Sequence, residues 1–256
     1  MTAKRATSKD TSAAEPWPPT TSETLMPQPM PERVEVPWRG YRLVPSVFPP
    51  VGLFDEVADD DEMAVVLALH VLTNPRIREE LGQLEQIPRD ERVYGPGSTP
   101  VMAAFCYPNP SGSRFSDGRF GVYYAASALA AAAAEVAYHR ERFYASTQAP
   151  AQRFVMRAYV NEWAAAMHDL REVDDRIHDP DHHGAAHRWA DRCRAEGSDG
   201  VLYRSVRSPG AECVAAFRPA AVKVPVTQAA HIELCWDGQR VTHWYELGQA
   251  VPLRVI

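Results

Sequence analysis

The sequence predicts an α+β fold with a mostly antiparallel sheet core, flanking helices and a C-terminal β-hairpin. Three observations in the 256 residues lead to this class. An Asp-Gly pair separates two strand-like runs within 231–245, which is the strongest short-range hairpin signal. An alanine-rich run without Gly or Pro at 128–144 is typical of a helix. Strand-like and helix-like segments do not alternate regularly, so a parallel α/β sheet is disfavoured.

The first third of the chain divides into an arm and the start of a domain. Residues 1–37 hold seven of the 22 prolines and few large apolar residues, which predicts a disordered arm. We expect a single domain at 38–256. Its first elements are predicted from composition and helix start signals as a strand at 39–46, a helix at 61–72, a short helix at 73–82 and a buried strand at 101–107.

The rest of the domain follows the same signals. The alanine-rich helix is expected to be capped by Ser127, and Gly197 is expected to end a second helix. The predicted elements are a strand at 119–126, the helix at 128–144, a strand at 152–160, a helix at 182–197, paired strands at 199–206 and 211–217, and the terminal hairpin at 231–245.

Charge and cysteine content limit the class of protein. The net charge of −6 gives no general attraction to nucleic acid or to an anionic membrane, so direct binding to either is not expected. We find no apolar run near the roughly 20 residues of a membrane span and no signal-type segment, so we expect the cytoplasm. The four cysteines are far apart, which predicts reduced, buried thiols and no zinc site.

A few polar residues stand out against apolar or turn-forming neighbours. Arg42 lies in an apolar strand, where a guanidinium is costly unless it meets an anion. Arg114 precedes the strand that carries Tyr124, and Glu135 follows Tyr124 by eleven residues, within the alanine-rich helix. Several arginines and hydroxyls with one acid favour a phosphate-bearing ligand over a metal or a two-carboxylate hydrolase. The alternative is that small residues serve tight packing and that Glu135 is solvated.

At these positions the sequence resembles the RES-domain family, which is named for a characteristic Arg, Glu and Ser. The matching pieces, in family order, are "YRLVPSVFPP", "RFSDGRFGVYYAASALAAAAAEVAYH" and "DGVLYRSVRSPGAECVAAFRP". They span 41–219. The family commonly reads Gly-x-Asn before the last strand, whereas this chain reads Gly210-Ala211-Glu212, so no ligand role is carried to that position. Segments 51–100 and 228–256 look like additions to the family core.

The resemblance implies an ADP-ribosyltransferase-like fold and an enzyme that consumes NAD as a substrate, with no bound cofactor and with inorganic phosphate as a possible co-substrate. Glu135 would stabilise the cationic ribose as the nicotinamide leaves. Arg42 and Arg114 would bind the pyrophosphate, and Tyr124 would stack on nicotinamide. Ser205 would position the ribose or phosphate. Tyr123 points to the opposite strand face and is expected in the core, although this assignment depends on the register.

RES proteins are typically toxins held inactive by an antitoxin with a helix-turn-helix domain of the Xre type, and we expect such a partner. The leading hypothesis is therefore a toxin that degrades NAD, as a glycohydrolase or a phosphorylase. The alternatives are a protein ADP-ribosyltransferase that uses the same pocket and a non-enzymatic module that binds through the hairpin at 231–245. The histidines around "HDPDHHGAAH" lack the glutamate of His-Glu-x-x-His, so we interpret them as a solvated helix start without metal.

Overall fold

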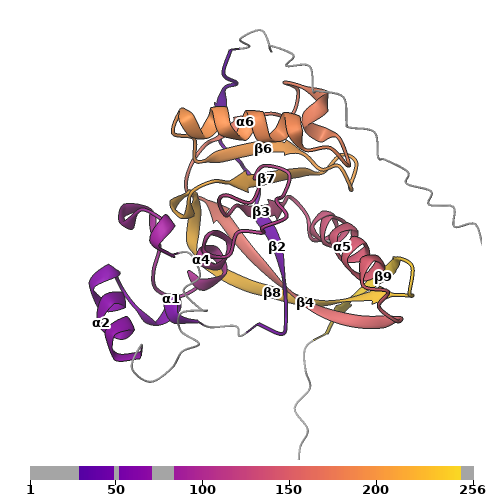
Figure 1. Ribbon diagram of the computed structural model, residues 1–256, viewed down its shortest axis with the longest axis horizontal. Helices are drawn as coiled ribbons and strands as arrows, with labels where there is room; N and C mark the ends of the chain where they lie inside the picture. The colour runs from indigo at the N-terminus through magenta and orange to yellow at the C-terminus, as the bar shows by residue number, and fades with distance from the viewer. Residues whose placement is uncertain (1–28, 49–51, 71–83, 249–256) are drawn as a thin grey trace, which may run out of the picture. The chain divides into compact units, whose positions relative to one another are not determined.

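The computed structural model describes residues 29–48, 52–70 and 84–248, and Figure 1 shows their strands and helices. The strands form a nine-stranded sheet in the order β1-β5-β6-β7-β3-β2-β4-β8-β9. Their bounds are β1 Arg33–Val34, β2 Gly40–Pro45, β3 Tyr123–Ala126, β4 Gln152–Trp163, β5 Met167–Asp169, β6 Gly200–Arg204, β7 Glu212–Ala216, β8 Val222–Trp236 and β9 Val241–Leu247. Neighbouring strands are antiparallel except β5 and β6, which confirms the predicted mostly antiparallel sheet.

Helices flank this sheet, as predicted. The α-helices are α1 Leu53–Glu56, α2 Asp60–His70, α4 Thr99–Cys106, α5 Leu129–Ser146 and α6 Gly184–Ala195, and short 3-10 turns are η1 Leu84–Gln86, η2 Arg89–Glu91, η3 Asp175–His178 and η4 Pro219–Ala221. Gly197 follows α6 with φ +67°, as its predicted stop requires. The helix predicted at 61–72 is confirmed as far as His70. The short helix predicted at 73–82 lies outside the described residues.

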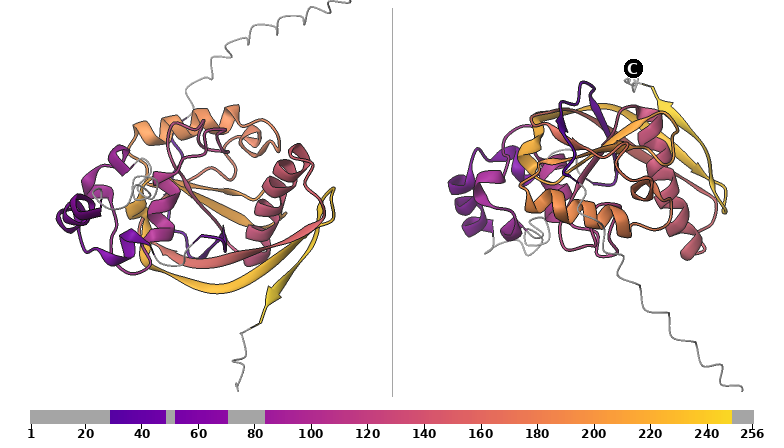
Figure 2. Two further views of the ribbon diagram at one scale, coloured as in Figure 1. Left: turned by 60° about the horizontal axis from the view of Figure 1, so that its bottom comes forward. Right: turned by 90° about the horizontal axis from the view of Figure 1, so that it is seen from above.

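The C-terminal hairpin has the turn chemistry that the sequence predicts. The Asp237 carboxylate accepts hydrogen bonds from the backbone N–H groups of Gln239 and Arg240 at 2.7 and 2.8 Å. Gly238 takes a φ of +103°, which an L side chain rarely adopts. Strand β8 pairs with β9 in the hairpin and, on its other edge, with β4. The long strands β4 and β8 bend together in Figure 2.

The prediction of a buried strand at 101–107 is wrong, because residues 101–106 belong to helix α4. Pro100 lies in the first turn of this helix, where its missing N–H has no cost. The helix is buried nearly all round, so its apolar run has no helical periodicity and resembles a buried strand.

The predicted cap of α5 is also wrong. Helix α5 begins after Ala128, and no side chain caps it. The Ser127 hydroxyl instead accepts the backbone N–H of Glu212 at 3.1 Å, and Ser127 N–H donates to Glu212 O at 2.8 Å. Ser127 therefore joins the end of β3 to the start of β7 rather than to the helix.

The sheet begins earlier in the chain than the predicted domain start at residue 38. Strand β1 pairs with β5 through Arg33 with His168 and Val34 with Met167. Arg33 also donates to the His168 ring at 3.5 Å, across 135 residues of chain. The predicted arm is therefore corrected for residues 33–34, because a two-residue strand carries no local signal and depends on a distant partner. Residues 1–28 of the arm lie outside the described residues.

The two faces of β3 pack against different helices. Tyr123 and Ala125 belong to the main core with Met102 and Phe105 of α4. Ala126 is paired with Cys213, so side chains at Ala126 and Tyr124 lie on the other face, because alternate residues of a strand point to opposite faces. Helix α5 contacts β2, β3 and β9. The candidate site residues are built around this second face.

Strands β2 and β3 diverge after a single register pair. Tyr41 is paired with Ala126, whereas β2 follows β4 over six register pairs from Gly40 to Pro45. The sheet thus divides at this point into β1-β5-β6-β7-β3 and β2-β4-β8-β9. We call the space beside Tyr124, where β2 and β3 separate, the fork.

Candidate active site

The centre of the candidate site is a hydrogen bond between Ser205 and Glu135. Ser205 Oγ, just after β6, donates to Glu135 Oε1 on α5 at 2.7 Å. The same oxygen accepts the backbone N–H groups of Arg207 and Ser208 at 3.3 and 3.0 Å. A hydroxyl has one proton and two lone pairs, and here all three are used. Ser205 therefore orients the carboxylate and has no free lone pair for attack.

Neutral side chains form the wall beside this pair. Burial and the nearby Glu135 charge raise the pKa of the Cys213 thiol to about 12. Tyr203 is paired with Cys213 and packs edge-on against Phe115, with ring centroids 4.9 Å apart. The thiol and the phenol stay protonated at neutral pH, so Glu135 supplies the negative charge at this wall.

Tyr124 lies on the same face as Cys213, as Ala126 and Cys213 are paired. Its hydroxyl is hydrogen-bonded to Ser113 Oγ at 2.8 Å and accepts Phe115 N–H at 2.9 Å. Burial raises the pKa of Tyr124 to about 12. Tyr123 is fully buried, which matches its expected place in the core. Tyr124 thus anchors the turn that carries Arg114.

Arg114 is 9% exposed and holds a neighbouring segment. Its Nη1 donates to the carbonyl oxygens of Ile177 and Asp179, both at 2.8 Å. One guanidinium nitrogen therefore joins the turn that carries Arg114 to the end of η3. Arg114 thus has a structural role that the sequence did not indicate, and its role at a pyrophosphate stays a prediction.

Arg42 lies away from the Ser205–Glu135 pair, in the fork. Its side chain projects from the same face of the sheet as Tyr123. Its guanidinium carbon is 4.7 Å from the centroid of the Tyr123 ring. Nη1 donates to the backbone oxygen of Tyr124 at 3.2 Å, while Nε is buried without a partner. Burial lowers the pKa of Arg42. The structure thus brings Glu135, Ser205, Tyr124 and Arg114 to one face and places Arg42 at the division of the sheet.

Arg207 and His183, to which the sequence assigned no role in the site, lie near His139, one turn after Glu135 on α5. Burial, followed by the charge of Arg114, lowers the pKa of His183 to about 4, and His139 and Arg207 act in the same direction. The Arg207 guanidinium lies 3.3 Å from the ring centroid of Tyr138, one turn after Glu135. Glu135, Tyr138 and His139 are spaced at i, i+3 and i+4, which places them on one face of the helix. This spacing was the signal in the sequence that Tyr138 and His139 lie beside the site.

The solvated interpretation of the histidine cluster is therefore wrong for part of it. His187 Nε2 is hydrogen-bonded to Ser113 O at 2.8 Å, and His178 Nε2 accepts the Arg204 N–H at 3.1 Å. His182 remains exposed. His187 and His178 thus contact, respectively, a turn and a strand that are distant in sequence. Among the residues that the structure describes, no three His, Cys, Asp or Glu side chains are grouped to hold a metal ion.

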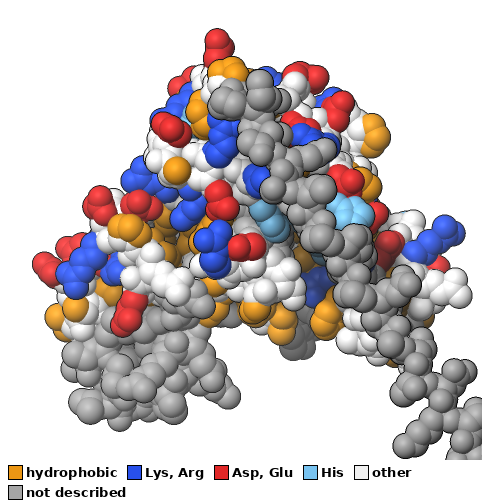
Figure 3. Space-filling view, turned by 45° about the horizontal axis from the view of Figure 1, so that its top comes forward, with side chains coloured by type: hydrophobic (Ala, Val, Ile, Leu, Met, Phe, Trp, Pro, Cys, Tyr) orange, Lys and Arg blue, Asp and Glu red, His pale blue; other side chains and the backbone are white. Residues whose placement is uncertain are grey.

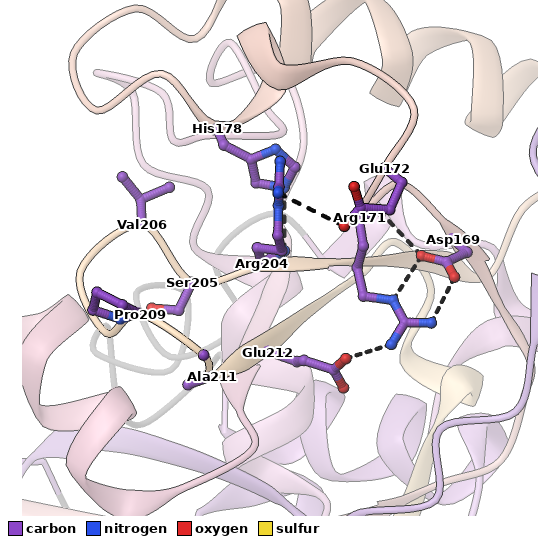
Figure 4. Close-up of a pocket in the computed structure, with 11 residues that line it drawn as sticks. Asp169, Arg171, Glu172, His178, Arg204, Ser205, Val206, Pro209, Ala211 and Glu212 are labelled. Atoms are coloured by element: carbon purple, nitrogen blue, oxygen red, sulfur yellow. Dashed lines mark hydrogen bonds and ion pairs between the residues drawn. The ribbon is translucent and has the colours of Figure 1, made fainter.

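A cavity of about 580 Å³ adjoins Ser205. Figure 4 shows Ser205 on one side of it and, on the other, Arg171 between Asp169 and Glu212. Arg171 forms ion pairs with both carboxylates, and Trp38 Nε1 donates to Glu212 Oε2 at 2.8 Å. Glu212, which replaces the family Asn, is therefore held by neighbours of its own chain. One face of the molecule, shown in Figure 3, carries basic, acidic and histidine side chains close together.

His178 lines this cavity, and its lowered pKa predicts that the stability of the fold depends on pH. Burial, then the charges of Arg204 and Arg114, lowers its pKa from 6.5 to about 4. The unfolded chain therefore binds a proton near pH 6.5 that the folded protein takes up only near pH 4. Stability should fall as the pH falls from 6.5 to 4. The urea midpoint, measured from pH 7.5 to 4.5, should depend less on pH in His178→Gln than in the wild type.

The exposed His182 provides the matched control for that titration. His182→Gln removes an exposed imidazole from the same segment and serves as the reference for the slope of His178→Gln. An unchanged slope in His178→Gln would show that the acid sensitivity arises elsewhere, for instance at His183, whose pKa is lowered in the same way.

The described helices were also compared with the requirements of a membrane span. Within residues 29–48, 52–70 and 84–248, the structure contains no helix with the length and apolarity to cross a bilayer.

Comparisons with known proteins identify the family. A curated relative, the uncharacterized protein y4oC of Sinorhizobium fredii (strain NBRC 101917 / NGR234), is 28% identical over 213 residues, which cover 82% of this chain and 88% of that protein. The crystal structure of the M. tuberculosis MbcT-MbcA toxin-antitoxin complex contains a chain with 14% identity and a TM-score of 0.37, covering 49% of this chain and 73% of that one. A sequence model described as the RES domain matches residues 89–237, which include Glu135, Ser205, Arg114 and Tyr124 but not Arg42. This protein therefore belongs to the RES domain family.

Proposed function

We propose that this protein is a toxin that cleaves the bond between nicotinamide and ribose in NAD. The observation that carries the proposal is the 2.7 Å hydrogen bond between Ser205 Oγ and Glu135 Oε1. It joins the Glu and the Ser of the family triad across 70 residues of chain and fixes one carboxylate oxygen. The other oxygen of Glu135 would then face the ribose of a bound substrate.

The chemistry needs one fixed negative charge. As the C1′–N bond breaks, its electron pair stays on the nicotinamide nitrogen, and the ribose becomes an oxocarbenium cation. A carboxylate already oriented for this charge stabilises the transition state more than the ground state. Water or phosphate then forms a bond to C1′ and loses its proton. NAD and water yield nicotinamide, ADP-ribose and a proton. NAD and phosphate yield nicotinamide, ADP-ribose that is phosphorylated at C1′, and a proton.

The other family residues have supporting roles in this proposal. Arg42 would bind the pyrophosphate from the fork, because its Nε has no protein acceptor. Tyr124 would contact the nicotinamide ring, and Arg114 would hold the 177–179 segment over the site. As in RES toxins generally, an Xre-type antitoxin would cover this surface in the cytoplasm. The proposal requires no metal or bound cofactor.

Nicotinamide release tests this function directly. Purified protein, freed of any antitoxin, is incubated with NAD with and without inorganic phosphate, and the products are separated. Ser205→Ala should lower the rate roughly 10- to 100-fold, the size expected for a hydrogen bond to a charged group. Ser208→Ala, in the same loop, keeps its backbone N–H to Ser205 and should stay near the wild type.

The products separate the remaining possibilities. ADP-ribose identifies a glycohydrolase, and its phosphorylated form identifies a phosphorylase. No release at high enzyme concentration would overturn the proposal. If label from NAD then appears on added proteins, the activity is protein ADP-ribosylation.

A further inference from the structure

A second buried arginine lies beside Arg42. Arg157 on β4 is 6% exposed. Its Nη1 donates to the carbonyl oxygen of Phe48 and to the hydroxyl of Tyr159, both at 3.2 Å. Its Nε is buried and meets no acceptor. Among the described residues, no carboxylate forms an ion pair with Arg157. A guanidinium keeps its charge at all accessible pH values, so an unpaired buried one is costly.

The strand register places the two arginines on one face. Arg42 is paired with Tyr159, and Arg157 is two residues before Tyr159, so all three side chains project from the same side of the sheet. The Tyr159 hydroxyl contacts Arg157, and the Arg42 guanidinium covers the neighbouring Tyr123. Each arginine has a buried Nε without an acceptor. Two adjacent strands thus present two incompletely satisfied cations around two tyrosines.

Such a pair fits an oxyanion that carries more than one negative charge. The planar N–H groups of guanidinium match phosphate oxygens, and a pyrophosphate can accept from two guanidinium groups at once. Phe48, whose carbonyl occupies one Arg157 nitrogen, is 56% exposed. The residue that an incoming anion would have to displace from Arg157 therefore lies at the surface.

We propose that Arg157, together with Arg42, binds phosphoryl oxygens of the ligand. This inference rests on the proposed function in taking the pyrophosphate of NAD as the natural source. Free inorganic phosphate offers the same chemistry, and the two sources are distinguished by titration. Arg157 is a binding residue in this scheme and takes no part in breaking the C1′–N bond.

Calorimetric titration with three probes tests the proposal. ADP carries the pyrophosphate, inorganic phosphate carries the single anion, and adenosine carries neither. Arg157→Gln should weaken ADP binding at least about tenfold, since one charged hydrogen-bonding group is lost. Weakened binding of phosphate with unchanged binding of ADP would instead assign the residue to the co-substrate. Arg153→Gln is the matched control, because Arg153 lies on the same strand and is 67% exposed.

Kinetics separate a binding role from a structural one. Arg157→Gln should raise the KM for NAD about tenfold and leave kcat within about twofold, as expected for an interaction shared by ground and transition states. Arg157→Lys retains the positive charge but not the planar donors. Its KM for NAD should therefore lie between that of the wild type and that of Arg157→Gln. Unchanged ADP and phosphate affinities together with an unchanged KM would overturn the inference.

A measurement on the wild type avoids any folding defect of the variants. The ¹H–¹⁵N signal of the Arg157 Nε–H, assigned by its absence from the Arg157→Lys spectrum, should shift when ADP is added. A signal that stays in place at saturating ADP contradicts the proposal. If ADP binding depends on Arg157 but NAD is not cleaved, the anion site stands and the proposed reaction falls. If NAD is cleaved with a wild-type KM in Arg157→Gln, the reaction stands and the anion site falls.

Discussion

Glu135→Gln should reduce nicotinamide release about a thousandfold, a loss typical of removing a preorganised electrostatic group. The amide has nearly the shape of the carboxylate, and its oxygen can still accept from Ser205 Oγ, which now contacts Glu135 Oε1 at 2.7 Å. What disappears is the negative charge that, in the proposed reaction, would face the oxocarbenium ion. The rate of nicotinamide release at saturating NAD measures the effect.

The fold of the Glu135→Gln variant should remain intact, with a thermal midpoint within a few degrees of the wild type. Glu196→Gln, at an exposed position after α6, removes a carboxylate elsewhere and should keep full activity. Activity of Glu135→Gln within tenfold of the wild type would show that the charge lies outside the reaction.

Gly121→Ala should destabilise the protein by about 3 kcal/mol, because it overpacks a rigid contact. A Cβ at Gly121 would lie 2.4 Å from both the Ala104 carbonyl oxygen and the Phe105 Cα. These are backbone atoms of α4, so the helix itself must move. Met102 and Phe105 would then lose their packing in the core. The thermal midpoint should fall by roughly 6 to 12 °C for a chain of this size.

Gly184→Ala is the matched control for this substitution. The nearest atom to its added Cβ is Arg188 Nη1 at 3.6 Å, an ordinary contact. Because Gly184 begins α6, alanine there should change stability by less than about 0.5 kcal/mol. Equal midpoints for the two variants would show that α4 can move away from Gly121 without loss of packing.

Local signals predicted most of the elements and failed where a distant partner decides. The Asp237–Gly238 turn specifies its hairpin within a few residues, so its prediction is confirmed. The segment of α4 failed because complete burial removes the periodicity that separates helix from strand. The cap at Ser127 failed because Glu212 competes for the hydroxyl. No local pattern could place β1, since its partner β5 lies far along the chain.

In the candidate site, too, the sequence indicated residues but not the contacts that depend on distant parts of the chain. The resemblance to the family indicated Glu135 and Ser205, but their hydrogen bond depends on how α5 and the loop after β6 come together across 70 residues of chain. The exact place of Arg42 depends on the divergence of β2 from β3, which strand alternation alone does not reveal. Arg157 was missed because a half-exposed strand was expected at 152–160, whereas its side chain is buried.

The strand order also determines when a growing polypeptide can fold during translation. Strand β2 must wait for β3 and β4, β1 must wait for β5, and β3 completes its pairing only with β7. A chain that leaves the ribosome from its N-terminus therefore carries unpaired strands through most of its synthesis. Ser205 emerges 70 residues after Glu135, so the carboxylate has no partner until late. Under the proposed function, a nascent chain would thus have no assembled Ser205–Glu135 pair until synthesis has passed β6.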